Sequence, residues 1–350
     1  MESINLNYVK VKTMEELSYK AKMSFSDSST ESTDKQIVNE NKKDEIDKNN
    51  CEDTKEFNLP LALKNYRSFV VLPLSPSSNS SLYSRNLHGK FLFIRHGQTD
   101  YNVDSTKIEL KKIRCMEKYL DCPLNSTGRL QAEEGGINFM DFDVEIGYVS
   151  PMRRCLETVY FMFKEHPKKS NFKFIVHPLI TEISNSVHGY ISDITESKNK
   201  YNMETEVKFD WSLFEALFPT PLEQNTFFIN NFSCLPNKIM EKHIEKIYQS
   251  FQSENFTKNI ASLAKIGYDC GISRLESLYH IWLRGMKFKE FLKEAYKNYL
   301  TETNKKVIVV SHNVFIRMLT SKEPFSNKNM DKYPKDSLNI NNCQGISIYV

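Results

Sequence analysis

The sequence predicts a three-layer α/β domain built on a mainly parallel sheet. Short apolar runs of strand length alternate with stretches of helical periodicity from residue 91 to the C-terminus, and this alternation is typical of a sheet covered by helices on both faces. Several of these runs end directly in polar side chains, as expected where the carboxyl ends of parallel strands build a site. A chain of 350 residues, 40% of them hydrophobic, is long enough to bury a substantial core.

The elements follow from apolar runs, periodicity and capping residues. Asn125 is expected to cap a helix that reaches about Met140. Other helices are predicted over Met152 to Phe163 and over the apolar positions that recur from Leu275 to Tyr299. The predicted strands are Phe91 to Ile94, Val144 to Val149, Phe172 to Val176, Lys306 to Val310 and Ile346 to Val350.

Two regions differ from this pattern. Residues 1–58 are predicted to form a disordered acidic tail, because Ser24 to Lys55 holds too few apolar side chains to offset its ordering entropy; a short helix is expected around Met14 to Met23. Residues 59–350 form the predicted catalytic domain, with a polar loop over 75–84. Residues 186–272 are expected to be a partly helical insertion that covers the site, with one helix whose apolar positions recur from Ile239 to Phe251.

Composition and charge exclude several classes of protein. Lys and Arg number 47 against 44 Asp and Glu, a formal charge of +3, which argues against a nucleic-acid-binding surface. Residues 1–58 hold 9 Lys and 13 acidic residues, and residues 186–272 hold 8 and 11, so the remainder holds 30 basic and 20 acidic residues. That remainder is a basic body suited to attracting a phosphate.

The cysteines and the hydropathy pattern bear on location. Seven dispersed cysteines are typical of free thiols in a reducing compartment. No apolar run approaches the roughly 18 residues of a membrane span, and the first residues lack the order of a signal peptide. We therefore expect a soluble cytoplasmic protein with no membrane partner.

Three strand ends carry residues suited to phosphoryl chemistry. Phe91 to Ile94 leads into Arg95 and His96, Val144 to Val149 into Ser150 to Arg154, and Val307 to Val310 into Ser311 to Asn313. Arginine forks and a histidine can neutralise a phosphate without a metal. A neutral imidazole is a competent nucleophile toward phosphorus, and a buried carboxylic acid could protonate the leaving oxygen.

At these residues the chain closely resembles the histidine phosphatase superfamily, also called phosphoglycerate-mutase-like, over roughly residues 88–350. The motifs that carry the resemblance are Phe93-Ile94-Arg95-His96-Gly97-Gln98-Thr99 with Asn102, Pro123-Leu124-Asn125 with Gly128, Ser150-Pro151-Met152-Arg153-Arg154, Glu276-Ser277 with Arg284, and Val309-Val310-Ser311-His312-Asn313. Residues 179–194, Phe218-Pro219 and Asn341-Asn342-Cys343 look most like the mutase-like phosphatase branch of fungi, plants and protists.

The resemblance implies a role for each residue. His96 would be the phosphorylated nucleophile, and Glu182, after the third strand, the proton donor; Asp193 and Glu196 remain alternatives for the donor. The phosphoryl oxygens would be bound by Arg95, Arg154 and His312, with a further hydrogen bond from Asn102. No metal and no cofactor are implied. Asn185 stands where that branch usually has an arginine.

The expected function is a metal-independent phosphatase of a small phosphorylated metabolite or a phosphoprotein. A phosphoglycerate-type mutase would use the same residues, and a weakly active scaffold that binds a phosphorylated ligand would keep the same pocket. The sequence names neither the substrate nor the oligomeric state.

Overall fold

The fold is a seven-stranded sheet between layers of helices, seen in a computed structural model. The structure describes residues 69–72, 91–142, 144–204, 206–231, 237–269, 275–296, 306–321, 333–334 and 337–348. The predictions for residues 1–58 and for the loop over 75–84 concern parts of the chain outside these ranges.

Five neighbouring strands of the sheet are parallel, as the alternating pattern predicts. The strand order is β1-β7-β2-β6-β3-β4-β5, and the pairs from β2 to β5 are all parallel, whereas β7 runs antiparallel to both β1 and β2. The strands are β1 (Phe69–Leu72), β2 (Phe91–Arg95), β3 (Val144–Val149), β4 (Lys173–Val176), β5 (Lys208–Asp210), β6 (Lys306–Ser311) and β7 (Gly345–Ile348).

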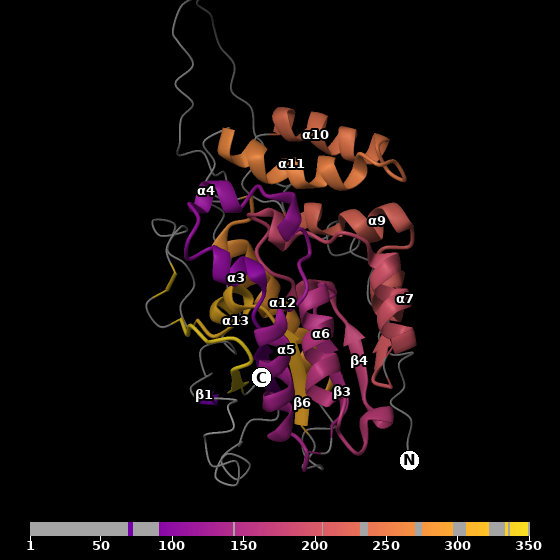
Figure 1. The fold of residues 1–350 in the computed structure, drawn as a ribbon, viewed down its shortest axis with the longest axis vertical. Coiled ribbons are helices and arrows are strands. Elements are labelled where there is room, and N and C mark those ends of the chain that lie inside the picture. The colour runs from indigo at the N-terminus through magenta and orange to yellow at the C-terminus, as the bar shows by residue number, and fades with distance from the viewer. Residues whose placement is uncertain are drawn as a thin grey trace, which may run out of the picture. The chain divides into compact units, whose positions relative to one another are not determined.

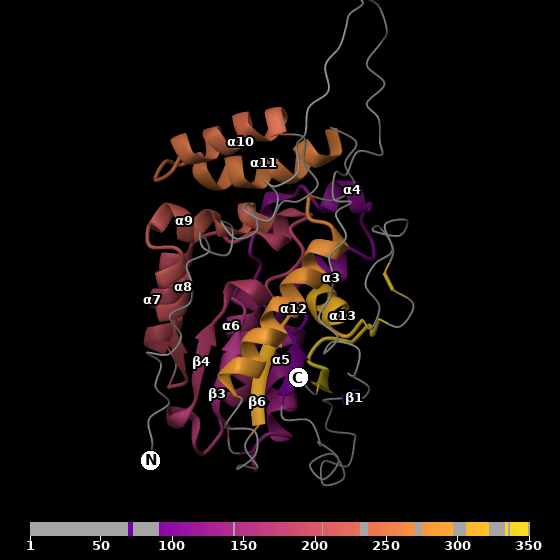
Figure 2. The same cartoon turned by 180° about the vertical axis from the view of Figure 1, so that it is seen from behind.

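The helices cover both faces of this sheet. In the described residues they are α3 (Asp100–Asp104), α4 (Leu110–Ile113), α5 (Ser126–Ile137), α6 (Arg153–Phe163), α7 (Ile194–Glu204), α8 (Ser212–Leu217), α9 (Pro221–Thr226), α10 (Asn237–Gln249), α11 (Phe256–Asp269), α12 (Leu278–Ala295) and α13 (Asn313–Leu319). Helices α5 and α6 lie on one face (Figure 1), and α12 lies on the other (Figure 2).

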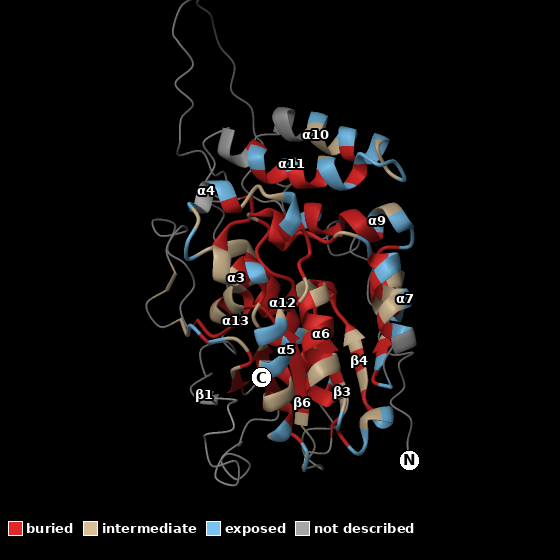
Figure 3. Cartoon of the chain, viewed as in Figure 1, coloured by how far each residue is buried: buried red, intermediate tan, exposed pale blue. Residues whose placement is uncertain are grey.

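The core is divided by the alternation of side chains along each strand. In β2, Leu92 and Ile94 pack with α5 and α6, whereas Phe91 and Phe93 pack with α12 and α13. Strands that are buried on both faces read as continuous apolar runs, and Figure 3 shows the buried residues that result along the sheet. The α/β sandwich and its parallel centre are therefore as predicted.

A third apolar cluster joins α11 to the loops at one end of the sheet. It contains Ile260 and Leu263 of α11 together with Tyr101, Val187 and Tyr190. Helix α10 runs beside α11 (Figures 1 and 2) and confirms the helix expected in this segment. The long segment before α12 thus packs on the loops that follow the strands.

The element predictions hold with a few differences at the edges. Asn125 caps α5, where its Oδ1 accepts a hydrogen bond from the Gly128 N–H at 2.8 Å. The last strand was predicted without a direction, and it is antiparallel. Strands β1 and β5 were not predicted, since each is a short edge strand of three or four residues.

The predictions about cysteines and about membrane-spanning segments can be compared with the described residues. The four described cysteines, Cys115, Cys122, Cys155 and Cys343, are all free thiols, as expected. Within the described ranges, no helix has both the length and the apolar character that a membrane crossing requires.

Candidate active site

The register of the parallel strands brings the candidate residues together. Arg95 at the end of β2 is level with Ser311 at the end of β6, and Val149 of β3 is level with Val310. The ladder continues one residue further on both sides, because His96 N–H donates to Ser311 O at 2.9 Å and Ser150 N–H donates to Val310 O at 3.1 Å. His96, Ser150 and His312 are therefore neighbours at one edge of the sheet.

His96 is almost fully buried, and its hydrogen bonds define its tautomer. Its Nδ1 lies 2.7 Å from the carbonyl oxygen of Gly97, and because a carbonyl only accepts, Nδ1 carries the proton. Nε2 is then the nitrogen with a free electron pair, and Arg154 Nε donates to it at 3.3 Å. Burial, reinforced by the charges of Arg154 and Arg95, holds the pKa of His96 well below its usual range.

Arg154 provides a buried cation with an unused donor. It stands in the first turn of α6 and has no exposed surface. Its Nη1 donates to the His188 carbonyl at 2.9 Å, but its Nη2 has no hydrogen-bond partner among the described residues. A buried donor without a partner costs free energy, so this geometry favours a ligand with acceptor oxygens.

Arg95 supplies a second guanidinium group to the same place. Its Nη1 donates to the Ile340 carbonyl at 2.8 Å, and its buried Nε has no partner in the part of the chain that the structure describes. Burial lowers its pKa despite the nearby Glu182. Two guanidinium groups with unused donors thus lie near His96, because Arg154 and Arg95 both act on its pKa.

His312 lies between the strand ends and is fully buried. Its Nε2 is 2.8 Å from the Ser150 hydroxyl oxygen and 3.4 Å from the Cys155 sulfur. Its ring centroid is 5.2 Å from that of His96. Burial, followed by the charge of Arg154, holds the pKa of His312 well below its usual range, so both imidazoles are neutral near pH 7.

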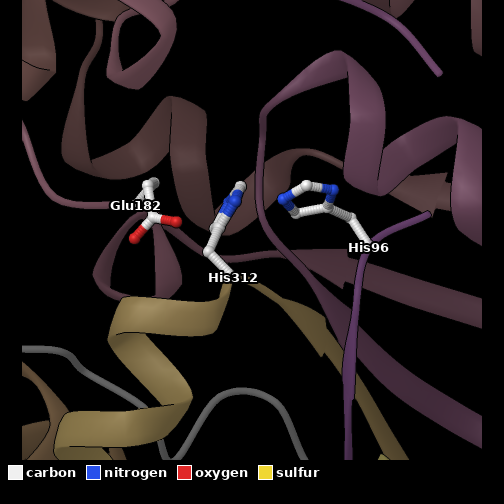
Figure 4. Close-up of side chains that lie close together, drawn as sticks. All are labelled: His96, Glu182 and His312. Atoms are coloured by element: carbon white, nitrogen blue, oxygen red, sulfur yellow. The ribbon is translucent and has the colours of Figure 1, made fainter. Parts of the chain in front are cut away.

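Glu182 completes the group from the loop after β4. Figure 4 shows the His312 ring between the Glu182 carboxyl group and the His96 ring, and one ligand atom of each lies within 4.8 Å of the others. Burial raises the pKa of Glu182, although Arg154 and the Ile183 N–H act in the opposite direction. Asp193 and Glu196 are instead exposed, and Asp193 Oδ1 accepts hydrogen bonds from the first N–H groups of α7.

These side chains favour an anion over a metal ion. His96, Glu182 and His312 are the kinds of residue that hold Zn²⁺. The charge of Arg154 acts on all three of these groups, however, and that of Arg95 acts on His96 and Glu182, so both guanidinium groups would repel a cation. The charge balance therefore matches a phosphate dianion.

Asn102 has a local structural role in the described geometry. It is the third residue of α3 and forms a reciprocal capping box with Thr99. The Asn342 side chain lies 3.5 Å from its Oδ1 and donates to the His96 carbonyl at 2.9 Å. A hydrogen bond from Asn102 to a substrate stays a prediction.

Other groups near the site were not assigned a role from the sequence. The buried His188 ring stacks on Tyr101 with centroids 4.0 Å apart, and its carbonyl holds Arg154. Thr158 Oγ1 accepts a hydrogen bond from the Gly97 N–H at 3.0 Å. Thr158 lies within the helix predicted over Met152 to Phe163, whereas no strand end or spacing marks His188.

The fold and the site define a class: an α/β protein with two neutral histidines and two arginines at the carboxyl ends of parallel strands. Comparison with known proteins agrees with this class. Residues 91–211 match the family model of the histidine phosphatase superfamily, branch 1. The match of this segment agrees with the superfamily that the motifs predicted.

Two curated relatives match shorter stretches. A stretch of 65 residues is 38% identical to the uncharacterized phosphatase PhoE of Bacillus subtilis and covers 19% of this chain and 29% of that protein. A stretch of 70 residues is 37% identical to a protein of Schizosaccharomyces pombe named as a probable phosphatase, with 20% and 29% covered. The chain thus spans less than a third of the length of either relative.

Similar solved structures include two phosphatases. The ecdysone phosphate phosphatase of Bombyx mori, in complex with tungstate, matches with a TM-score of 0.36 and 14% identity, over 73% of this chain and 87% of that one. A mycobacterial glucosyl-3-phosphoglycerate phosphatase matches with a TM-score of 0.34 and 15% identity, over 66% and 77%. At these TM-scores the likeness of the whole chains is weak.

Proposed function

We propose that this chain is a metal-independent phosphomonoesterase that works through a phosphohistidine on His96, with Glu182 as the proton donor. The observation that carries the proposal is the pairing of a neutral, oriented imidazole with a buried guanidinium group. His96 Nε2 lies 3.3 Å from Arg154 Nε, and Arg154 Nη2 has no partner in the described residues. A phosphoryl group would use both the electron pair and the open donor.

In the first step, His96 Nε2 attacks phosphorus and a P–N bond forms. The bond from phosphorus to the ester oxygen breaks, and Glu182 transfers its proton to that oxygen, so that an alcohol leaves. Arg154, Arg95 and His312 stabilise the phosphoryl oxygens. Glu182 has to be protonated for this step, which its raised pKa supports.

In the second step, water attacks the phosphohistidine. The Glu182 carboxylate, now ionised, takes a proton from this water as the new P–O bond forms. The P–N bond breaks, inorganic phosphate leaves, and His96 returns to its neutral form. The low pKa of His96 supports this return, because an imidazolium has no electron pair with which to begin the next cycle.

Residues 186–272 are part of the proposal as a cap over the site. The third apolar cluster supports this role, because α11 packs with Val187 and Tyr101, and Tyr101 stacks on His188 next to Arg154. The substrate class is a small phosphorylated metabolite or a phosphoprotein, and the free cysteines suit the cytoplasm.

Trapping the intermediate tests the proposal. The full chain, assayed in a chelator with a radiolabelled aryl phosphate and quenched in alkali, is expected to retain label as an acid-labile, alkali-stable adduct. His96→Ala should abolish the adduct and lower turnover by roughly 10³-fold or more. The matched control is His243→Ala, a half-buried histidine on α10, which should leave both unchanged.

Three outcomes would contradict the proposal. Full activity in His96→Ala would exclude the nucleophile. Transfer of label between phosphoglycerates without release of free phosphate would indicate a mutase. Binding of phosphopeptides by a chain that turns over no phosphomonoester would indicate a scaffold.

A further inference from the structure

A buried ion pair between Arg284 of α12 and Glu276, just before this helix, holds the loop that carries Glu182. Arg284 is 3% exposed and Glu276 is fully buried. They form a two-pronged contact, in which Arg284 Nε lies 2.7 Å from Glu276 Oε1 and Arg284 Nη2 lies 3.2 Å from Glu276 Oε2. The planar fork of arginine makes such a contact geometrically specific.

The same two side chains bind the loop backbone on both sides of Glu182. On the preceding side, Arg284 Nη1 donates to the carbonyl oxygens of Leu179 at 2.6 Å and Thr181 at 3.3 Å. On the following side, Glu276 Oε2 accepts a hydrogen bond from the Ser184 N–H at 2.9 Å. Residues 181–183 belong to no helix or strand, so much of their anchoring comes from Arg284 and Glu276.

We propose that Arg284 and Glu276 are positioning residues that set the place and the protonation of the Glu182 carboxyl group. This inference rests on the proposed function, in which Glu182 is the proton donor. Among the described residues, the hydrogen bond of Arg284 to Glu182 is to its backbone carbonyl oxygen, at 3.5 Å, and not to its carboxyl group. The pair therefore acts through the loop and through its charges.

Glu276 balances the charge of Arg284, and Arg284 is one of the cations that act on Glu182. The charged and titratable groups that act on Glu182 come from several elements; they are Arg95, His96, Arg154, Cys155, Arg284 and His312. Of the three arginines, Arg284 is the one with a carboxylate partner among the described residues, and His280 also contacts that carboxylate at 2.9 Å. Glu276 thereby weakens the effect by which the charge of Arg284 lowers the pKa of Glu182.

Removing Glu276 or Arg284 singly should shift the pKa of Glu182 in opposite directions. In Glu276→Gln the charge of Arg284 is no longer balanced, so the pKa of Glu182 falls. In Arg284→Gln the Glu276 carboxylate is no longer balanced, so the pKa of Glu182 rises. The alkaline limb of the pH–rate profile should move by roughly half a unit to one unit, down in the first variant and up in the second. A merely structural role would not move it in two directions.

Leaving-group dependence is the second readout. A dinitrophenyl phosphate needs no proton on its leaving oxygen, whereas an alkyl phosphate does. In the first step, measured as the burst of alcohol or phenol release before the phosphohistidine is hydrolysed, Glu182→Gln, Glu276→Gln and Arg284→Gln should each lose roughly 10²-fold on the alkyl ester and keep the dinitrophenyl rate within about threefold. Leu292→Ala, a core variant two turns further along α12, should lower stability without changing the ratio of the two rates.

The double variant E276Q/R284M covers a failure of the single variants to fold, because removing both charges leaves no unpaired buried charge. It should restore the pH limb toward that of the unmodified chain while the alkyl ester remains slow. Arg284→Lys keeps the charge and loses the fork, so it should slow the alkyl ester with a smaller pH shift.

The outcomes separate this inference from the proposed function. If His96→Ala keeps its activity, or Glu182→Gln treats both esters alike, the proposed function fails. If Glu182→Gln discriminates between the esters while the Arg284 and Glu276 variants keep the original ratio and pH limb, the proposed function stands and the positioning role is overturned. Shifts of the pH limb in the same direction would also overturn it.

Discussion

At the scale of single residues, burial decides which groups of the site carry charge. Desolvation is the largest influence on the pKa of His96, of His312 and of Glu182, and it favours the neutral form of each. The permanent charge is left to the arginines, which do not lose their protons near pH 7. A neutral nucleophile, a neutral acid and fixed cations are what the first step of the proposed reaction needs.

Asp121 shows the same effect outside the reacting groups. It has no exposed surface, its φ angle is 44°, and its Oδ1 accepts a hydrogen bond from Arg153 N–H at 3.0 Å at the start of α6. Met152, the residue before that helix, provides no side-chain cap. Burial raises the pKa of Asp121 to about 6, although Arg154 opposes this. Asp121 thus caps the helix that carries Arg154.

Asp121→Asn is expected to stabilise the chain at high pH. The folded pKa lies above the unfolded value, so the folded state binds more protons between about pH 4 and 6, and the stability due to this group falls as the pH rises through that range. Asparagine keeps the acceptor and tolerates a positive φ. At pH 8 the variant should gain roughly 1–3 kcal/mol, and the gain should shrink toward pH 5.

Urea unfolding of both chains from pH 5 to 8 measures this difference. A free-energy difference that is constant with pH would contradict the raised pKa, whereas a loss at every pH would show that the carboxylate stabilises α6 in its charged form. Asp193→Asn, which changes an exposed carboxylate just before α7, is the matched surface substitution.

The sequence could predict residues of this site because they follow strands. Arg95, His96 and His312 come directly after apolar runs, and the parallel register of β2 and β6 places them at one edge of the sheet. Asp121, His188 and Cys155 could not be assigned a role in this way. Their place depends on a left-handed turn, on the path of the loop after Glu182 and on helix packing, which a single sequence does not encode locally.

At the scale of elements, the start of α5 touches the loop after β2 backbone to backbone. A Cβ on Gly128 would lie 2.0 Å from the Gln98 carbonyl oxygen, and one on Gly97 would lie 2.5 Å from the Gly128 oxygen. The loop is thereby held where the Gly97 carbonyl can accept the proton of His96 Nδ1. Further along α5, a Cβ on Gly136 would lie 2.1 Å from the Met162 oxygen of α6.

Gly128→Ala and Gly136→Ala should therefore both lower the stability of the chain, but only Gly128→Ala should also lower its activity. Each forces a methyl group against backbone, which costs roughly 1–3 kcal/mol or more. Only Gly128→Ala displaces the loop of His96, and its turnover per folded molecule should fall roughly 10- to 100-fold. Denaturation midpoints and turnover at low temperature measure both effects. Equal turnover in the two variants would show that this contact does not position His96.

The strand predictions show which elements a sequence defines. Strands β2, β3, β4 and β6 are apolar throughout or nearly so, because helices cover both their faces, and each was predicted within one residue at either end. The direction of β7 could not be predicted, because it depends on where the chain returns after α13. Strand β5 has only three residues and gives no pattern.

At the scale of the whole molecule, charge is unevenly distributed along the chain. The residues outside 1–58 and 186–272 hold 30 basic and 20 acidic residues, although the whole chain has a net charge of only +3. A positive body raises the local concentration of a dianionic substrate and speeds its encounter with the site. This long-range attraction is screened by salt, whereas contacts inside a buried site are screened much less.

Salt should therefore lower kcat/KM of the full chain and leave kcat nearly constant. Between about 20 and 200 mM ionic strength, where the Debye length shortens from roughly 20 to 7 Å, kcat/KM for a phosphomonoester dianion should fall roughly 3- to 10-fold. Sodium chloride and potassium glutamate at equal ionic strength separate screening from specific chloride binding. Because Arg154 and His312 are fully buried, a fall in kcat at constant KM would locate the effect in the site itself and contradict attraction by the basic body.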